Sequence, residues 1–420
     1  MNPRHNNFYT HECRSIGVPL RVSTLLGLLL AFLITPSSQA QCQYEAILLE
    51  GPLCSGGNPA GITPQGLDAN GNTVGSSSCF FNFFASMVRA DGTASWLTPP
   101  PNSGESKGIA ILDPDHVVGR AVPTGAPIGI AAIWEFGQGR FLNMLPNTDA
   151  GVASGMNSSG QIVGLNYDSI FGPRQAVLWE GDQPIALDLP VERNGNSSAN
   201  DINEQGQITG WMGGAPSTDS QAFIWDNGVV LDLGAIPGGT TAEGMAINNL
   251  GHVTGRGHIP DGVTEFGSKH AFFWDGQTMI RLPELPDTVE SLPNDINDAD
   301  QIVGQSLVDD GVFAKYFTLW QDGQVYNLDD LIVTNLSNVT NSNAYAINND
   351  GQILVHAGSE SYLLNPIDSP PGDTDNNCVV DVDDLLCVLT EWGNTISIAD
   401  VDDDGIVDVL DLLQVLADWG

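Results

Sequence analysis

The sequence predicts a mainly β protein, in which a seven-bladed β-propeller of four-stranded repeats is followed by a small α-helical module. Three observations support this fold class: a motif that recurs about every 45 residues, a Trp-ended strand with the same spacing, and a duplicated acidic segment near the C-terminal end. The composition agrees, because 48 Gly and 25 Pro in 420 residues, with 15% charged residues, are typical of a turn-rich β protein.

The recurring motif is a small or apolar residue, then Ile-Asn, two variable residues, Gly-Gln, two β-branched residues and Gly. Clear copies lie at residues 201–210, 246–255, 295–304 and 346–355, and looser copies lie at 66–75, 110–119 and 155–164. A period of about 45 residues is the size of a propeller blade, whereas a β-solenoid coil is shorter and helical repeats carry a 3.6-residue period. Seven copies therefore predict seven blades.

Each blade is expected to contain four short strands. The first surrounds the Ile-Asn pair, the second follows Gly-Gln, and the fourth closes the unit. The third ends in Trp in five copies, at Trp134, Trp179, Trp225, Trp274 and Trp320, with Arg89 and Leu364 in the equivalent place of the first and last copies. The Asn-x-x-Gly spacing places residues that tolerate positive φ in the turn between the first two strands.

The ends of the array predict how the ring closes. The last copy runs into a Pro-rich segment before a fourth strand, whereas residues 43–50 have the pattern of a strand ahead of the first copy. We expect this N-terminal strand to complete the last blade by pairing with residues 362–365. The propeller domain is then residues 41–366, followed by a stiff linker at 367–372 and a second domain at 373–420.

The motif asparagines Asn203, Asn248, Asn297 and Asn348 have two interpretations. They could line one rim and bind a ligand or ion, or their side chains could cap the hairpin turns; we favour capping, the ordinary role of Asn at such positions. The Trp series is likewise interpreted as core between blades rather than as a sugar platform. His116 and His252 stand where other copies have Gln and are interpreted as structural substitutions.

The repeat resembles the HAF family of extracellular repeats, which carries the same Ala-Ile-Asn-x-x-Gly-Gln-Ile-Val-Gly and Ala-Phe-x-Trp elements. The resemblance covers residues 43–365 and is strongest over 155–355, while Asp68 and Leu112 stand where Asn is usual. It implies an extracellular location and no known catalytic activity.

Two similar acidic segments begin at Asp373 and Asp400, 27 residues apart. Oxygen-bearing side chains recur at positions 1, 3, 5, 9 and 12 of a twelve-residue loop, and a backbone carbonyl follows at position 7, which is the pattern of a calcium loop. The predicted ligands of the first ion are Asp373, Asp375, Asn377, the carbonyl of Val379, Asp381 and Asp384. Those of the second ion are Asp400, Asp402, Asp404, the carbonyl of Ile406, Asp408 and Asp411.

Apolar residues follow each loop at helical spacing, which predicts two short helices. The stripes are Val382, Leu385, Leu386, Leu389 and Trp392 in the first copy, and Val409, Leu412, Leu413, Leu416 and Trp419 in the second. We expect the two helices to bury these stripes against each other, and two calcium ions to balance the charge of the loops.

The 27-residue duplication with Asp at position 12 resembles a type I dockerin, the EF-hand-like module that attaches enzymes to cohesin scaffolds. This resemblance covers residues 373–420 and implies a cohesin-like partner or another secreted or cell-surface protein. Loop positions 10 and 11, where the family carries a hydroxyl-bearing recognition pair, hold Val382-Asp383 and Val409-Leu410. We therefore expect a partner that differs from a cellulosome cohesin.

The charge balance excludes several partners. Acids outnumber bases 51 to 13, for a formal net charge of −38. Such a chain has no basic face for nucleic acid and is disfavoured at anionic membrane surfaces.

The N-terminus has the pattern of a secretion signal. Arg14 and Arg21 precede an apolar run at residues 25–34, which is too short to span a membrane comfortably. Ser38-Gln39-Ala40 fits a small-x-small cleavage site, so we expect residues 1–40 to be a signal peptide and the protein to be secreted, without membrane insertion.

Export permits disulfides, and five cysteines follow the predicted cleavage site. In a propeller blade, the loop entering the first strand and the loop joining the second and third strands lie on the same face. Cys54 and Cys79 occupy these two loops, so we expect them to pair, with Cys42 left over on the opposite face. Cys378–Cys387 is a second candidate pair.

No catalytic motif is found: the sequence has no Gly-x-Ser-x-Gly, His-Glu-x-x-His, Walker or dinucleotide loop. The main hypothesis is a non-catalytic binding or scaffolding propeller attached to a partner through the calcium module. The alternative is a polysaccharide-active enzyme, a glycoside hydrolase or lyase. Two or three carboxylates gathered with an Arg or Tyr in one deep axial pocket would favour the enzyme.

Overall fold

The computed structural model describes residues 43–79, 82–168, 172–190, 195–213, 220–261, 267–309, 314–334, 336, 342–367, 382–390, 392, 399–401 and 406–418. The chain divides into two compact units, one spanning Glu45–Asn365 and the other containing Met1–Tyr44 with Pro366–Gly420. The two units are described separately below.

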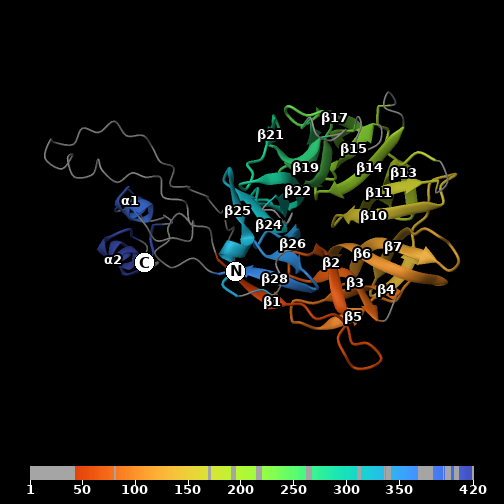
Figure 1. Cartoon of the computed structure of the whole chain (residues 1–420), viewed down its shortest axis with the longest axis horizontal. Helices are drawn as coiled ribbons and strands as arrows, with labels where there is room; N and C mark the ends of the chain where they lie inside the picture. Colours follow the sequence, from red (N-terminus) through yellow and green to blue (C-terminus); the bar gives the residue numbers. More distant parts are fainter. Residues whose placement is uncertain are drawn as a thin grey trace, which may run out of the picture. The chain divides into compact units, whose positions relative to one another are not determined.

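The larger unit is a ring of seven four-stranded antiparallel sheets, and it confirms the predicted seven-bladed propeller (Figure 1). Blades 1 to 3 are β2 Gly61–Leu67, β3 Thr73–Cys79, β4 Asn82–Val88 and β5 Ala94–Trp96; β6 Ser103–Asp113, β7 His116–Pro123, β8 Ile130–Glu135 and β9 Gln138–Phe141; and β10 Ala150–Met156, β11 Gln161–Tyr167, β12 Gln175–Glu180 and β13 Gln183–Ala186. Blades 4 to 6 are β14 Asn196–Ile202, β15 Ile208–Gly213, β16 Gln221–Asp226 and β17 Val229–Gly234; β18 Glu243–Ile247, β19 Val253–Ile259, β20 Ser268–Trp274 and β21 Met279–Arg281; and β22 Thr288–Ile296, β23 Ile302–Val308, β24 Ala314–Gln321 and β25 Gln324–Asn327, followed by the 3-10 helix Leu328–Leu331.

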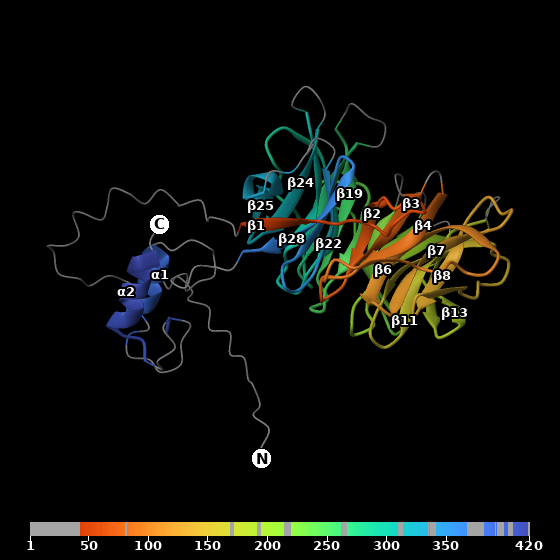
Figure 2. The same cartoon turned by 90° about the horizontal axis from the view of Figure 1, so that it is seen from below.

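Blade 7 combines both ends of the array, as the sequence predicts. It contains β26 Ser342–Ile347, β27 Ile353–Ala357 and β28 Glu360–Pro366, and its outer strand is the N-terminal β1 Tyr44–Leu48. Backbone hydrogen bonds run from Leu49 N to the Ser361 carbonyl at 2.8 Å and from Ile367 N to the Gln43 carbonyl at 2.8 Å, which makes the pair antiparallel. Figures 1 and 2 both show β1 beside β28. The ring is closed by these hydrogen bonds between distant parts of the chain.

Every innermost strand carries a β-bulge at the same position, just before the motif. The register shifts between the residues that flank Gln65, Ile109, Ser154, Asn200, Met245, Asn294 and Tyr345. A bulge bends a strand and re-aims the side chain that follows it. Its recurrence directs the residue ahead of Ile-Asn toward the neighbouring blade in each repeat.

The core of the propeller lies between blades. Val118 of blade 2 packs with Ile162 and Trp179 of blade 3, and Val163 of blade 3 packs with Ile208 and Phe223 of blade 4. Glycine after the β-branched pair permits close strand approach: a Cβ on Gly164 would lie 2.0 Å from the Val152 carbonyl oxygen. The motif Gly is therefore required by packing between the first two strands of a blade.

The Trp series belongs to this core, as expected. Trp134, Trp179 and Trp320 are buried, and each donates its indole N–H to the loop that leaves the preceding blade. The acceptors are the carbonyls of Thr98 at 3.0 Å, Asn143 at 2.7 Å and Pro283 at 2.7 Å, in that order. The indole N–H groups of Trp225 and Trp274 are buried without a hydrogen-bond partner in the part of the chain described.

The smaller unit contains α1 Val382–Thr390 and α2 Val409–Asp418. Their shared core consists of Cys387, Val388, Ala399, Val407 and Val415, with Leu385, Val401 and Leu412 packed against it.

The predicted burial of whole apolar stripes is wrong. Leu385 and Leu412 pack inward, but about half of the surface of Leu386, Leu389, Trp392, Val409, Leu413 and Leu416 is exposed. The loop residues Ala399, Val401 and Val407 contribute to the core in addition to the helices. The side chains of Val382 and Trp419 lie outside the described residues.

Candidate functional site

Two places hold the residues that the sequence singled out: the axial channel of the propeller, where the motif asparagines lie, and the second acidic loop. The asparagines lie at the turn between the first two strands of their blades. In four blades the Asn side-chain oxygen accepts two backbone N–H groups of its own turn, two and four residues ahead; the residues are Asn203, Asn248, Asn297 and Asn348. Asp68 makes the same contacts in blade 1. The capping interpretation is confirmed.

The side-chain NH₂ group of each motif Asn has a second role that the sequence did not reveal. It donates to the backbone carbonyl of the equivalent residue in the next blade. The bonds run from Asn157 to Asn203, Asn203 to Asn248, Asn248 to Asn297, Asn297 to Asn348 and Asn348 to Asp68, all at 3.0–3.1 Å. The regular recurrence of Asn from one repeat to the next was the sequence signal for this second role. In a closed ring, equivalent atoms of neighbouring blades lie side by side.

This belt is interrupted at blade 2. Asp68 has no side-chain donor for that blade, and the turn there is built one residue later, where Asp113 accepts from the backbone N–H of Asp115 at 2.8 Å. Leu112, which aligns with the motif Asn, contributes no polar group. The belt therefore links six of the seven blades and leaves the blade 1–2 and blade 2–3 junctions without it.

A second row of polar contacts lies at the channel mouth, on the residue after each motif Asn. The backbone N–H of each such residue donates to the side chain of the equivalent residue in the next blade. The bonds run from Glu204 to Asn249, from Asn249 to Asp298 and from Asp298 to Asn349, at 2.8–3.0 Å. The Asp298 carboxylate also accepts the side-chain amides of Asn249 and Asn349, at 2.9 and 2.8 Å. These residues, with Ile202, Ile247, Ile296 and Ile347 below them, surround a cavity of about 210 Å³.

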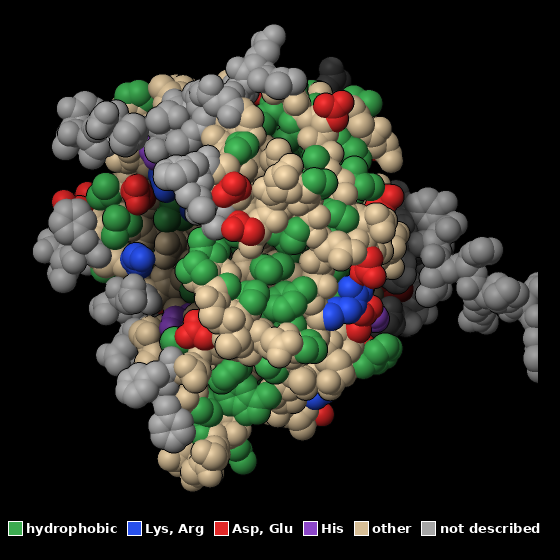
Figure 3. Space-filling view, turned by 90° about the vertical axis from the view of Figure 1, so that its right-hand side faces the viewer, with side chains coloured by type: hydrophobic (Ala, Val, Ile, Leu, Met, Phe, Trp, Pro, Cys, Tyr) green, Lys and Arg blue, Asp and Glu red, His purple; other side chains and the backbone are tan. Residues whose placement is uncertain are grey.

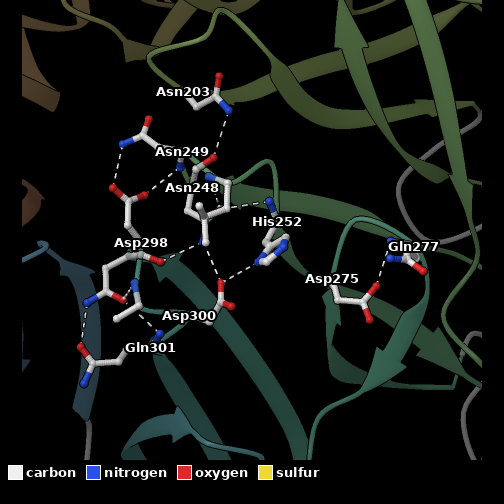
Figure 4. A network of polar contacts seen from close by, with 12 residues as sticks. Asn203, Asn248, Asn249, His252, Asp275, Gln277, Asp298, Asp300 and Gln301 are labelled. Carbon is white, nitrogen blue, oxygen red and sulfur yellow. Dashed lines mark hydrogen bonds and ion pairs between the residues drawn. The ribbon is translucent and has the colours of Figure 1, made fainter. Parts of the chain in front are cut away.

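The substitution of His for Gln at position 252 is coupled to a second substitution in the next blade (Figure 4). In other blades the motif Gln accepts the NH₂ group of its own Asn, as Gln301 does from Asn297 at 2.7 Å. His252 instead contacts Asp300 at 2.8 Å, and the same Asp300 oxygen accepts from Asn248 at 2.8 Å. Asp300 stands where other turns have Gly and adopts φ 59°. His252 is a structural substitution, as expected.

His116, the other substitution of the motif Gln, is also structural. Its ring nitrogen contacts both carboxylate oxygens of Asp113, at 2.9 and 3.0 Å, within its own turn.

Two carboxylates lie deeper along the axis. Asp201 and Asp295 occupy the position after the bulge in blades 4 and 6, within the identical segments Asn-Asp-Ile-Asn. Each accepts from its own next residue and also from the following blade: Asp201 from Ile247 N and Asp295 from Ile347 N, both at 2.9 Å. They join blade 4 to 5 and blade 6 to 7.

The burial of these carboxylates changes their acidity. Desolvation raises the pKa of Asp201 to about 6, and desolvation together with the charge of Asp201 raises the pKa of Asp295 to about 7. Both residues nevertheless keep part of their surface exposed.

Several carboxylates and amides of the channel are engaged in bonds that join blades. Among the described residues, those that line the 210 Å³ cavity include no Arg or Tyr. Of the predicted alternatives for this face, the described residues favour a structural one.

The structure places the second acidic loop in part. Asp400, Ile406, Asp408 and Asp411 are described, whereas Asp402 and Asp404 lie outside the described residues. Of the first loop, Asp373, Asp375, Asn377, Val379 and Asp381 lie outside the described residues, and Asp384 is described only as part of the α1 backbone. No group of three potential metal-binding side chains is found within the described part of the chain.

Asp411, at position 12 of the second loop, is fully buried. One carboxylate oxygen accepts from Val401 N at 2.5 Å and the other from Asp408 N at 2.7 Å, so the side chain is directed toward both ends of the loop. No Lys or Arg follows Lys315 in the sequence. Asp411 is therefore held by backbone hydrogen bonds, in a module that has no Lys or Arg to pair with it.

The predicted disulfide Cys54–Cys79 is present, with a Cα–Cα distance of 5.7 Å. Cys387 is also disulfide-bonded. Its proposed partner Cys378, like Cys42, lies outside the described residues, as does the predicted signal peptide at 1–40. Among the described residues, no helix is both long and apolar enough to cross a membrane.

No family model and no curated protein matches the chain. Solved propeller structures do: oligogalacturonate lyase from Vibrio parahaemolyticus at 8% identity and a TM-score of 0.50, over 77% of this chain and 97% of that one. TolB from Acinetobacter baumannii matches at 13% identity with a TM-score of 0.39, over 61% of this chain and 63% of that one. Acylaminoacyl peptidase from Pyrococcus horikoshii matches at 10% identity with a TM-score of 0.43, over 72% of this chain and 51% of that one. This chain thus matches only about half to two thirds of the latter two proteins. At these identities the likeness shows the propeller fold alone.

Proposed function

We propose that this protein is a secreted, non-catalytic binding or scaffolding propeller, which attaches to an extracellular or cell-surface partner through a calcium-dependent, dockerin-type module. The observation that carries the proposal is Asp411: a fully buried carboxylate at loop position 12, held between Val401 N and Asp408 N, in a module with no basic side chain. Calcium would be held by the two predicted loops and would neutralise their carboxylates.

The exposed apolar side chains of the module support attachment to a protein partner. Leu386 and Leu389 on α1, and Leu413 and Leu416 on α2, each leave about half of their surface exposed. Leucines three residues apart lie on the same face of a helix, and contiguous exposed apolar surface is typical of a protein-binding site. Because residues 373–420 contain 13 acids and no Lys or Arg, we expect a cohesin-like or other secreted partner with an apolar patch and a basic rim.

The resemblance to HAF repeats, and the use of described channel side chains in bonds between blades, support a non-catalytic propeller. A polysaccharide-active enzyme remains the competing function, and the fold shared with a lyase does not favour it over binding. Incubation of the protein with polygalacturonate and other acidic polysaccharides should release no unsaturated or reducing ends. Turnover that is lost in Asp201→Asn or Asp295→Asn would establish the enzyme instead.

The attachment is tested with the full-length protein as bait in the secreted fraction of its source. We expect a partner that is retained in calcium and released by chelator, and that is lost with Asp411→Ala. Asp115→Asn, an exposed acid on the propeller, is the matched control and should retain the partner. Calorimetry should show two unequal calcium sites, the tighter one abolished by Asp411→Ala. Retention of the partner in excess chelator would contradict the proposal.

A further inference from the structure

Blade 2 contains two basic side chains directly opposite each other. Lys107 on β6 and Arg120 on β7 are register partners across the antiparallel pair. Like charges in this position repel, and an acidic protein with 51 carboxylates has many possible partners for them. Neither residue forms an ion pair within the described part of the chain, since the ion pairs there involve other bases.

Blade 5 holds an ion pair at the same position. The equivalent register pair is Glu243 and Arg256, next to the same bulge and the same paired glycines. Here the Arg256 guanidinium binds the buried Glu243 carboxylate at 3.1 Å. In blade 2, Lys107 stands where blade 5 has Glu243. Arg256 is therefore neutralised by its register partner, whereas Arg120 has a second base opposite it.

The two bases face a small cavity between blades 1 and 2. It measures about 150 Å³ and is lined by Ser76, Phe83, Glu105, Ser106, Lys107, Arg120 and Val122. Because one water occupies ~30 Å³ of liquid, the space admits a carboxylate or sulfate group. Figure 3 shows one side of the molecule, on which Lys and Arg side chains are few.

The two serine hydroxyl groups at this cavity can each donate a further hydrogen bond. Ser76 is 6% exposed, and its hydroxyl makes no hydrogen bond in the described structure. Ser106 is 3% exposed and accepts from Ala85 N at 3.0 Å, which leaves its own proton free to donate. Both hydroxyl groups can therefore donate to an acceptor that enters the cavity. Glu105 also lines the cavity but forms no ion pair with either base.

The backbone beside the two bases is closely packed, although the Arg120 side chain is exposed. A Cβ on Gly108 would lie 2.4 Å from Val74 Cγ2, so β6 lies directly against blade 1. Burial, and secondarily the charge of Arg120, lowers the pKa of Lys107. A bound anion would stabilise the charged form of Lys107 and offset its repulsion from Arg120, because it supplies the opposite charge.

We propose that the cavity between blades 1 and 2 is an anion-binding site, in which Lys107, Arg120 and Ser76 hold a carboxylate or sulfate group of a small ligand. The guanidinium and ammonium groups provide charge-assisted donors, and the Ser76 hydroxyl fills the position of a neutral donor. The exposed ring of Phe83 and the side chain of Val122 provide an apolar flank for the carbon part of the ligand. The site is independent of the proposed attachment function.

The test uses the full-length protein at constant ionic strength, with sulfate, acetate and glucuronate as separate probes and glucose as the uncharged control. At ten times the dissociation constant of a binding anion, the thermal midpoint should rise by about 2–3 °C. Glucuronate above acetate would identify a sugar acid, and sulfate above both would identify a sulfated ligand. No shift with any of the three anions would overturn the proposal.

Two variants separate site binding from a general salt effect. Lys107→Glu recreates the pair of blade 5, so it should raise the midpoint without anion and abolish the anion response. Ser76→Ala should weaken the response without removing it. Arg256→Gln, which removes a base that is already neutralised, should leave the response unchanged. An equal anion response in wild type and Lys107→Glu would also overturn the proposal, and Arg120→Gln repeats the test if Lys107→Glu does not fold.

Discussion

Asn348 in the last blade donates a hydrogen bond of 3.0 Å from its side-chain amide to the backbone carbonyl of Asp68 in the first blade, 280 residues away. The bond continues the belt that links the motif asparagines of neighbouring blades across the junction where the chain begins and ends its ring. The propeller is thus closed twice: by the β1–β28 pair at the outer edge and by this contact at the axis.

Asn348→Ala should lower the free energy of unfolding by about 2 kcal/mol, because it removes the bond to Asp68 and the cap of its own turn. Asn348→Asp retains the capping oxygen but not the donor, so its loss of stability reports the bond to Asp68 together with the 2.8 Å bond to Gln352 within the same turn. Asn70→Ala, an exposed turn residue, should stay within about 0.5 kcal/mol of wild type. Denaturant unfolding measures all three. Equal stability of Asn348→Asp and wild type would show that the inter-blade bond contributes nothing.

The axial carboxylates should make stability fall as pH rises. The folded-state pKa values of Asp201 and Asp295, about 6 and about 7, lie above the ordinary Asp value of 3.8. The folded protein therefore holds these protons more tightly than the unfolded chain, and their favourable contribution is lost between about pH 4 and pH 7.

The measurement is the thermal midpoint of wild type and of Asp201→Asn/Asp295→Asn across this range. Other acids titrate as well, so the informative quantity is the difference between the two proteins. The difference should change in favour of the variant as pH rises. A constant difference from pH 4 to pH 8 would rule out raised pKa values.

His252 and Asp300 should behave as a coupled pair. His252→Gln alone leaves Asp300 with one partner fewer, and Asp300→Gly alone leaves His252 and the Asn248 amide without their shared acceptor. The double variant restores the Gln and Gly of the other blades, as in Gln207 with Asn203 at 2.9 Å. The summed cost of the single variants should exceed that of the double by about 0.5–1 kcal/mol. Strict additivity in denaturant unfolding would contradict this coupling.

The Cys54–Cys79 disulfide should stabilise blade 1. It closes a loop of 25 residues, for which loop entropy gives about 3 kcal/mol. Cys54→Ser/Cys79→Ser should show this loss under non-reducing conditions. The variant should also be insensitive to a reductant that destabilises the wild-type propeller, provided that the other disulfides are monitored by mass.

Much of the propeller was predictable because its determinants are local. The motif recurs in seven copies, with Asn-x-x-Gly turns in four of them and a Trp-ended strand in five, and each of these elements acts within its own hairpin. The spare strand at 43–50 and the loops that hold Cys54 and Cys79 followed from counting strands in a closed ring. None of these inferences required knowledge of how one blade packs on the next.

The tertiary structure alone decided the contacts between blades and between helices. The second bond of each Asn, the pairing of His252 with Asp300, and the unpaired bases Lys107 and Arg120 depend on which atoms face each other across a junction. The helical spacing placed Leu386 and Leu413 on apolar stripes, but the stripes are wider than the surface that a neighbour covers. Periodicity defines a face of an element, whereas the part of that face that is buried depends on the distance and angle of what packs against it.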